Sequence, residues 1–131
     1  MAMSNYVPYH ALSILKAKEL SSGLSQQARY KAIRSYINRS FVYDYIKAAT
    51  VKKRGVLPDI ASCWDKRMGI CQDLAAMAVG MLRAVGLKAN LVIGHADGMY
   101  HAWVETAYGI YDPTAEIQHK KVKKYRKERV Y

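Results

Sequence analysis

The sequence lacks the features that mark membrane-spanning and repetitive proteins. Its longest strongly apolar run, Leu74 to Leu82, is far shorter than the roughly 20 residues that a membrane-spanning helix needs. The first residues show no basic region followed by an apolar stretch and a small-residue cleavage site, so no signal peptide is visible. Repeats, low-complexity tracts and Pro/Gly/Ser linkers are absent too, so we expect a single domain over residues 1–131. The compartment stays open between the cytoplasm and an excised domain of an exported protein.

Cysteine is scarce, which limits both disulfides and metal sites. Only Cys63 and Cys71 occur, and two thiols so close in a chain with an ample core favour free cysteines over a disulfide framework. A resting bridge between them, opened by reduction, remains the alternative. Together with His95 and His101, these cysteines lack the short paired spacings of metal ligands such as C-x-x-C. The sequence therefore predicts no metal site and no cofactor.

Acidic residues are few, and the excess of positive charge suggests an anionic partner. Lys and Arg number 21 against 10 Asp and Glu, which gives a net charge of +11, and much of it lies in residues 119–129. Such a field attracts polyanions such as nucleic acid, an anionic lipid surface or an acidic polymer. We favour the simpler interpretation of a solvated basic tail or edge strand, since no motif with groove-reading geometry accompanies the charge.

Apolar periodicity predicts helices in the first two thirds of the chain. The expected helices cover residues 11–20, residues 26–39 after a cap at Ser25, and residues 71–85 before a stop at Gly86. The last of these is apolar nearly all round, which indicates a buried central helix. Residues 41–45 are β-prone, and residues 59–66 have room for one or two helical turns. We expect the helical part to cover about 10–86.

Strand signals follow the central helix. Residues 88–96 and 100–107 flank Asp97-Gly98, a strong tight-turn signal, and a second turn at Tyr108-Gly109 leads to a third strand over 110–112. The fold class is therefore α+β, with N-terminal helices and a central helix packed on a small antiparallel sheet over about 88–114. Residues 115–131 would form a basic C-terminal segment.

Cys71, His101 and Asp112 supply the three groups needed for acyl transfer through a thioester. The thiol is the nucleophile, the imidazole moves its proton, and the carboxylate orients the imidazole. Cys71 falls at a helix start, where unpaired N–H groups and the helix dipole favour a thiolate, and its own N–H is a candidate oxyanion donor. His101 and Asp112 fall on strands expected to pair. Each residue alone would more often be structural, but the three contexts together favour a site.

Other polar and aromatic residues have a simpler role available. Trp103 could shield the histidine–aspartate pair or only pack in the core, and Asp73 could cap the helix start. Trp64 is expected to pack beside the Cys71 loop. His95 and Asp97 could reach the rim of the site, but a polar turn is the favoured role.

The sequence resembles a known family in three segments. GICQDLAAMAVGMLRAVGLKANLVIG, then HAWVE, then YDPT, is similar to the core of the transglutaminase-like superfamily of papain-type cysteine enzymes over Gly69 to Thr114, and the upstream stretch 37–49 is similar to the segment that precedes this core. The resemblance implies Cys71 as nucleophile, His101 as general base and acid, and Asp112 as the orienting residue. It implies no calcium dependence, because the β domains of the large crosslinking enzymes are missing.

The favoured function is a cysteine peptidase or amidase acting on a protein or peptide substrate. A crosslinking transglutaminase, with a lysine amine as acyl acceptor, is the second enzymic hypothesis. A non-catalytic module that binds an anionic polymer through its basic surface is the third. Superfamily members differ in substrate, so fold and triad leave the substrate and the acceptor open. The sequence also leaves the oligomeric state open.

Overall fold

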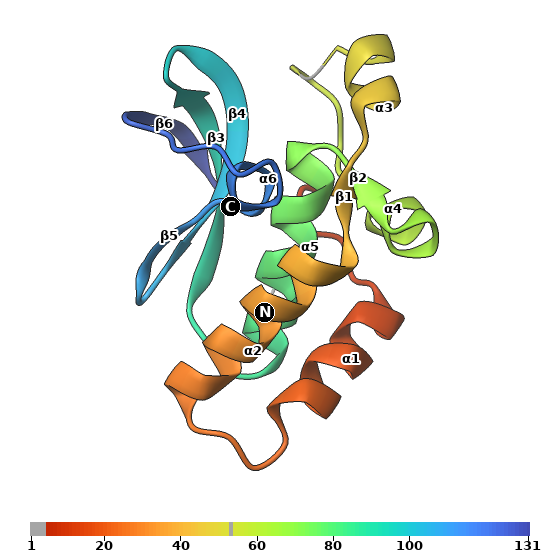
Figure 1. Cartoon of the computed structure of the whole chain (residues 1–131), viewed down its shortest axis with the longest axis vertical. Coiled ribbons are helices and arrows are strands. Elements are labelled where there is room, and N and C mark those ends of the chain that lie inside the picture. Colours follow the sequence, from red (N-terminus) through yellow and green to blue (C-terminus); the bar gives the residue numbers. More distant parts are fainter. Residues whose placement is uncertain (1–4, 53) are drawn as a thin grey trace.

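A computed structural model describes residues 5–52 and 54–131 of the chain (Figure 1). The helices are α1 (Ala11–Ser21), α2 (Gln26–Ser40), α3 (Tyr45–Thr50), α4 (Ile60–Lys66), α5 (Cys71–Ala84) and α6 (Pro113–Ile117). The strands are β1 (Val42–Tyr43), β2 (Met68–Gly69), β3 (Ala89–Ala96), β4 (Met99–Thr106), β5 (Gly109–Tyr111) and β6 (Tyr125–Val130). The predicted α+β class is confirmed.

Helix α5 is the centre of the molecule. It lies between the β-sheet and the α1–α2 pair, and packs against both (Figure 1). The first nine of its residues, Cys71–Val79, are buried without interruption, as its apolar composition predicts. The N-terminus of α2 is fixed by the predicted cap, because the Ser25 hydroxyl accepts a hydrogen bond from the N–H of Ala28.

The main sheet has four antiparallel strands in the order β5-β4-β3-β6. The predicted turn Asp97-Gly98 joins β3 to β4, and their register places His101 opposite Gly94. The next turn lies at Ala107-Tyr108, one residue earlier than predicted, so β5 already begins at Gly109. The third strand ends at Tyr111, one residue earlier than predicted, because Asp112 caps α6. Pro113 fits the first turn of a helix, but it has no N–H to donate to a neighbouring strand.

The sheet extends beyond the predicted boundary near residue 114. Strand β6 lies in the basic C-terminal segment and pairs with β3 at the edge of the sheet. Gly94 makes this pairing possible, since a Cβ atom there would collide with the backbone carbonyl of Arg126. The register shifts between Ile93 and Gly94, a bulge at the same point. Of the two interpretations of the basic segment, a solvated tail and an edge strand, residues 125–130 therefore form the edge strand.

A second, two-stranded sheet connects the helical part to the start of α5. Strands β1 and β2 are parallel, with Tyr43 opposite Gly69, and the N–H of Asp44 donates to the Gly69 carbonyl at 3.0 Å. The Asp44 carboxylate then caps α3, which the sequence did not predict, through the N–H of Lys47 at 2.9 Å. This connection brings residues 42–47 beside the segment that leads into Cys71.

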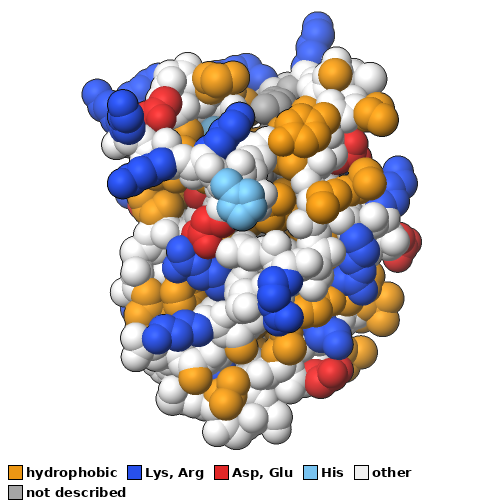
Figure 2. All heavy atoms as spheres, in the orientation of Figure 1, with side chains coloured by type: hydrophobic (Ala, Val, Ile, Leu, Met, Phe, Trp, Pro, Cys, Tyr) orange, Lys and Arg blue, Asp and Glu red, His pale blue; other side chains and the backbone are white. Residues whose placement is uncertain are grey.

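The surface carries mostly positive charge. Figure 2 shows Lys and Arg side chains spread over the face viewed, with fewer Asp and Glu among them. Across residues 5–52 and 54–131, no helix is both long and apolar enough to cross a membrane. The same residues contain no group of three or more His, Cys, Asp or Glu placed to hold a metal ion.

Candidate active site

Cys71 is the first residue of α5 and is almost completely buried, with 1% of its surface exposed. As an N-terminal residue of the helix, its N–H has no acceptor within α5. The thiol donates to the side-chain oxygen of the adjacent Gln72 at 3.0 Å, and Gln72 is itself buried. The sulfur is therefore held in a fixed position at the end of the helix rather than on an exposed surface.

The carboxylate of Asp73 fixes this end of α5, which confirms the predicted cap. Its Oδ2 accepts from the N–H of Ile70 at 3.0 Å and from Nζ of Lys47 at 2.8 Å, and its Oδ1 accepts from the N–H of Asp59 at 2.8 Å. Asp73 is 1% exposed, so these donors replace the water that the buried charge has lost. One carboxylate thereby ties α3, α4 and β2 to the turn that holds Cys71.

Gly69 leaves room for neighbouring side chains of the protein itself. A Cβ atom at this position would lie 2.8 Å from Sγ of Cys63 and 2.9 Å from Cβ of Asp73. The space beside Gly69 is therefore filled by Cys63 and Asp73 and is not open to a substrate. Both cysteines are free thiols, and burial, followed by the charge of Asp73, raises the pKa of Cys63 to about 12. Cys63 is thus inert as a nucleophile at neutral pH.

His101 on β4 contacts Asp112, which lies at the end of β5. His101 Nε2 is 2.8 Å from Oδ2 of Asp112. The same oxygen accepts from the hydroxyl of Tyr125 at 2.9 Å, while Oδ1 accepts from the N–H of Ala115 at 3.1 Å and so caps α6. The carboxylate is 4% exposed and has a donor on each oxygen, which locks the orientation of the imidazole.

The ionisation of His101 links it to both other predicted site residues. Burial lowers the pKa of His101, but the hydrogen bonds with Asp112 and with the Cys71 thiol, and the charges of both groups, raise it to about 9. Cys71 therefore lies close enough to interact with the ring. Since Nε2 faces Asp112, Nδ1 is the nitrogen left to face the sulfur. The structure brings the three residues together at the start of α5.

Trp103 covers the imidazole and is fully buried. Its ring stacks beside His101, with 6.2 Å between centroids, and lies 4.8 Å from the ring of Tyr125. The indole thus fills the space between the histidine and the C-terminal strand. Of the two roles open to Trp103, shielding of the His101–Asp112 pair and core packing, its position serves both.

An ion pair behind the site holds α6 against α2. Arg34 contacts Glu116 with two nitrogens, Nε at 2.9 Å and Nη2 close to the second oxygen, and Asn38 donates to Glu116 at 2.8 Å. Asn38 also accepts from the hydroxyl of Tyr111 at 2.7 Å. Because Asp112 caps α6 and follows Tyr111, this network fixes the backbone on both sides of the carboxylate.

A groove of about 350 Å³ adjoins His101. Its lining comes from β1, α3, the β3–β4 hairpin, α6 and the segment before β6, with Tyr43, Thr114 and Lys120 among the residues. Burial raises the pKa of Tyr43, with the charge of Cys71 the next contribution, so the phenol keeps its proton beside the sulfur. The groove gives a substrate access to the imidazole.

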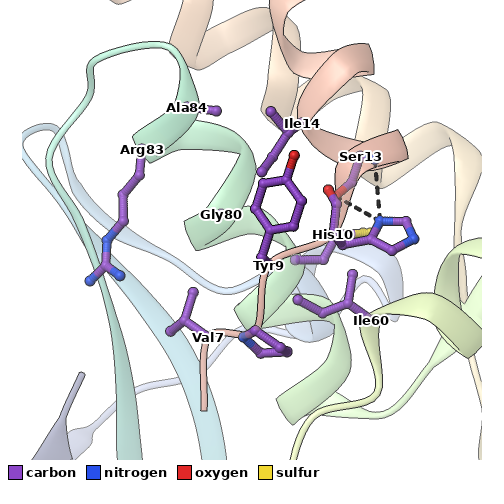
Figure 3. A pocket seen from close by; sticks show the side chains of 11 residues that line it. Val7, Tyr9, His10, Ser13, Ile14, Ile60, Gly80, Arg83 and Ala84 are labelled. Atoms are coloured by element: carbon purple, nitrogen blue, oxygen red, sulfur yellow. Dashed lines mark hydrogen bonds between the residues drawn. The ribbon is translucent and has the colours of Figure 1, made fainter. Parts of the chain in front are cut away.

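A second cavity, of about 190 Å³, lies between α1 and the opposite side of α5 (Figure 3). Its wall is mostly apolar, and the polar side chains of His10, Ser13 and Arg83 have structural partners. His10 accepts from the N–H of Ser13 and caps α1, while Arg83 donates to the carbonyls of Ala89 and Tyr131. We therefore take the groove, and not this cavity, as the candidate site.

The residues given a simpler role lie outside the His101–Asp112 contact. His95 pairs with Glu128 at 2.7 Å, and Asp97 accepts from the N–H groups of Lys123 and Lys124, so both organise the edge strand. Asp97 in addition lines the groove beside His101. Trp64 packs against the rings of Phe41, Tyr36 and His10 and the guanidinium of Arg67.

The sequence profile of the transglutaminase-like superfamily matches residues 16–118, more than half of the chain. The chain belongs to the transglutaminase-like superfamily. No match was found among curated proteins. The superfamily assignment supports a cysteine protease or transglutaminase type of enzyme.

Solved structures share the fold at low sequence identity. A candidate cysteine protease from Cytophaga hutchinsonii matches with a TM-score of 0.62 and 21% identity over 86% of this chain and 40% of that one. A structure described as a TGase matches with a TM-score of 0.60 and 20% identity over 79% and 30% of the two chains. A candidate protease from Parabacteroides distasonis matches with a TM-score of 0.53 and 18% identity over 73% and 21%. The chain thus spans less than half the length of these proteins.

Sequence reasoning missed two residues that contact predicted site residues, Tyr125 and Gln72, and one that pairs with the capping residue Asp73, Lys47. Tyr125 was placed in a basic tail, Lys47 in a segment without assigned structure, and Gln72 in the apolar helix. The available signal was weak. An isolated tyrosine among Lys and Arg, or a polar residue beside Cys71, has many surface roles, and only the tertiary fold decides among them.

Proposed function

We propose that the protein cleaves peptide or carboxamide bonds through a Cys71–His101–Asp112 triad, as a cysteine peptidase or amidase. The 2.8 Å contact of His101 with Asp112 carries the proposal, because the same imidazole also interacts with the Cys71 thiol. Membership of a superfamily that contains thiol-dependent enzymes agrees with this chemistry.

In the first half-reaction, the sulfur of Cys71 attacks the substrate carbonyl carbon and forms an S–C bond. The proton given up by the thiol is held on His101, whose raised pKa favours the imidazolium. As the C–N bond breaks, His101 passes this proton to the leaving amine, which departs neutral. Asp112 keeps the ring in one orientation and balances its charge.

In the second half-reaction, water attacks the thioester. His101 accepts a proton from the water, the C–S bond breaks, and the acid product leaves the restored thiolate–imidazolium pair. The negative charge on the carbonyl oxygen develops near the N-terminus of α5. There the N–H of Cys71 can donate to it, with the helix dipole adding to the stabilisation. An amine in place of water would give transfer instead of hydrolysis.

The test is alkylation by iodoacetamide at neutral pH, followed by peptide mapping. We expect one adduct, on Cys71, because the pKa of Cys63 is raised to about 12, whereas the Cys71 thiol can pass its proton to His101. Cys71→Ala should remove the adduct, and Cys63→Ala, the matched control, should keep it. Equal alkylation of the Cys71→Ala variant would exclude this residue as the nucleophile. A fluorescent amine incorporated into a glutamine-containing protein would favour crosslinking over hydrolysis.

A further inference from the structure

The groove beside His101 has a wall of mixed apolar and polar side chains. Its apolar wall includes Ala48, Ala96, Met99 and Val122, and the rings of Tyr43 and Tyr100 add to it. Its volume of about 350 Å³ lies at the lower end of the ~300–1,000 Å³ that is typical of ligand pockets. The apolar wall favours a ligand with a hydrophobic side chain. The polar groups of the groove then decide which other groups that ligand carries.

One polar group in the groove has no partner within the protein. The hydroxyl of Thr114 is buried and, across residues 5–52 and 54–131, makes no hydrogen bond, although the residue is only 4% exposed. Buried hydroxyls are normally hydrogen-bonded, because leaving one unpaired costs about 1–3 kcal/mol. Thr114 lines the groove two residues after Asp112. A backbone amide of a bound peptide would satisfy it.

The charge in the groove is positive. Lys120 and Lys121 line it and are exposed. Arg54 lies 4.5 Å from the centre of the Tyr100 ring and shares its charge with Glu128 at 3.8 Å. The acidic residue of the groove, Asp97, already accepts from two backbone N–H groups of the edge-strand segment, and these bonds lower its pKa. Among the residues that line the groove, no carboxylate therefore forms an ion pair with Lys120 or Lys121.

We propose that this groove binds a peptide substrate through an acidic residue that lies next to an apolar one. The inference rests on the proposed function, since it names the substrate class for the same site. The apolar side chain packs on the groove wall, the acidic side chain pairs with Lys120 and Lys121, and the hydroxyl of Thr114 contacts the peptide backbone. His101 lines the groove and, in the proposed function, passes its proton to the leaving amine. The groove therefore holds the part of the peptide that carries this amine.

The experiment measures binding to the Cys71→Ala variant, so that turnover is not needed. Three blocked hexapeptides, each with one Leu beside Glu, Gln or Lys, are titrated while NMR follows the backbone signals of Ala96, Thr114 and Val122. We expect the Glu peptide to bind about two- to fivefold tighter than the Gln peptide and the Lys peptide to bind weakest, as exposed charge pairs of this kind contribute. The preference should weaken as salt is added.

Matched variants separate the groove from overall charge. Lys120→Glu/Lys121→Glu should reverse the order of the Glu and Lys peptides. Lys31→Glu/Lys88→Glu, with the same change in net charge on α2 and at the far end of β3, should leave it unchanged. Thr114→Val should weaken all three peptides by a similar factor.

Two outcomes would overturn the inference: no saturable binding of the Glu peptide at the groove signals, or equal loss of its preference in the Lys31/Lys88 control. Neither affects the proposed function, which depends on alkylation of Cys71. Conversely, unaltered alkylation of the Cys71→Ala variant would remove the proposed function while the peptide titration still reported on the groove.

Discussion

Two buried carboxylates, Asp73 and Asp112, lie at the starts of α5 and α6, Asp73 as the third residue of its helix and Asp112 as the N-cap. Each accepts a backbone N–H at its helix start, from Ile70 and from Ala115, and each is paired with one basic side chain. Their exposures, 1% and 4%, are almost equal. The difference lies in the partner: Lys47 for Asp73 and His101 for Asp112.

This difference makes the Lys47–Asp73 pair structural, whereas the His101–Asp112 pair contains a group that can exchange a proton. A lysine ammonium ordinarily keeps its proton at neutral pH, so the Lys47–Asp73 pair ties elements together without changing state. An imidazole can gain and lose a proton near physiological pH, and His101 in addition lines a groove and interacts with a thiol. A carboxylate at a helix start therefore serves stability at α5 and, in the proposed function, proton transfer at α6.

The largest expected effect comes from Asp112→Asn. The amide can still accept from the N–H of Ala115, so α6 keeps its cap, but it no longer balances an imidazolium. We expect turnover of an activated ester such as p-nitrophenyl acetate to fall by about 10²–10⁴-fold, with a small change in stability. Asp65→Asn, on α4, serves as the control. Activity of Asp112→Asn within twofold of the unmodified protein would show that the carboxylate has no role in proton transfer.

At the other carboxylate, Asp73, the expected effect is on stability and not on turnover. Lys47→Met leaves Asp73 buried without its ammonium partner. The free energy of unfolding should fall by about 2–4 kcal/mol, somewhat below the value for a fully buried pair because Lys47 is partly exposed. Urea unfolding measures this loss. Lys16→Met, which removes the exposed pair with Glu19, should change it by less than about 0.5 kcal/mol. Equal losses in the two variants would contradict the structural role of Asp73.

A smaller effect should follow from Tyr125→Phe. The variant removes one hydrogen bond to Oδ2 of Asp112 and keeps the ring beside Trp103, so it should cost about 0.5–1.5 kcal/mol in stability. Without the phenol, Oδ2 interacts more strongly with the imidazolium, so the pKa of His101 should rise further. Tyr9→Phe, at an exposed tyrosine, is the control. An unchanged His101 titration in Tyr125→Phe would mean that Tyr125 only packs.

Much of the fold followed from local patterns in the sequence. The α2 and α5 helices, the Ser25 cap and the Asp97-Gly98 turn were predictable because apolar periodicity, capping residues and turn residues all act within a few positions. The proximity of His101 to Asp112 followed from the expectation that their strands pair. The α6 helix was missed because it is a single short turn that depends on the Asp112 cap.

The edge strand was harder to predict for a physical reason. Residues 125–130 carry four charged side chains in YRKERV, a composition equally compatible with a solvated tail. Pairing depends on Gly94, more than thirty positions away, because only a glycine lets the β6 backbone approach at that point. The contacts of Tyr125 and of Lys47 are likewise long-range, and no local pattern encodes them.

The most direct test of the account is the titration of His101 followed by NMR of its ring protons. In the unmodified protein, the pKa should be about 9, and it should fall in Cys71→Ala, because the interaction with the thiol is one of the causes that raise it. A pKa that is the same in both proteins would contradict the coupling of sulfur and imidazole, and with it the triad.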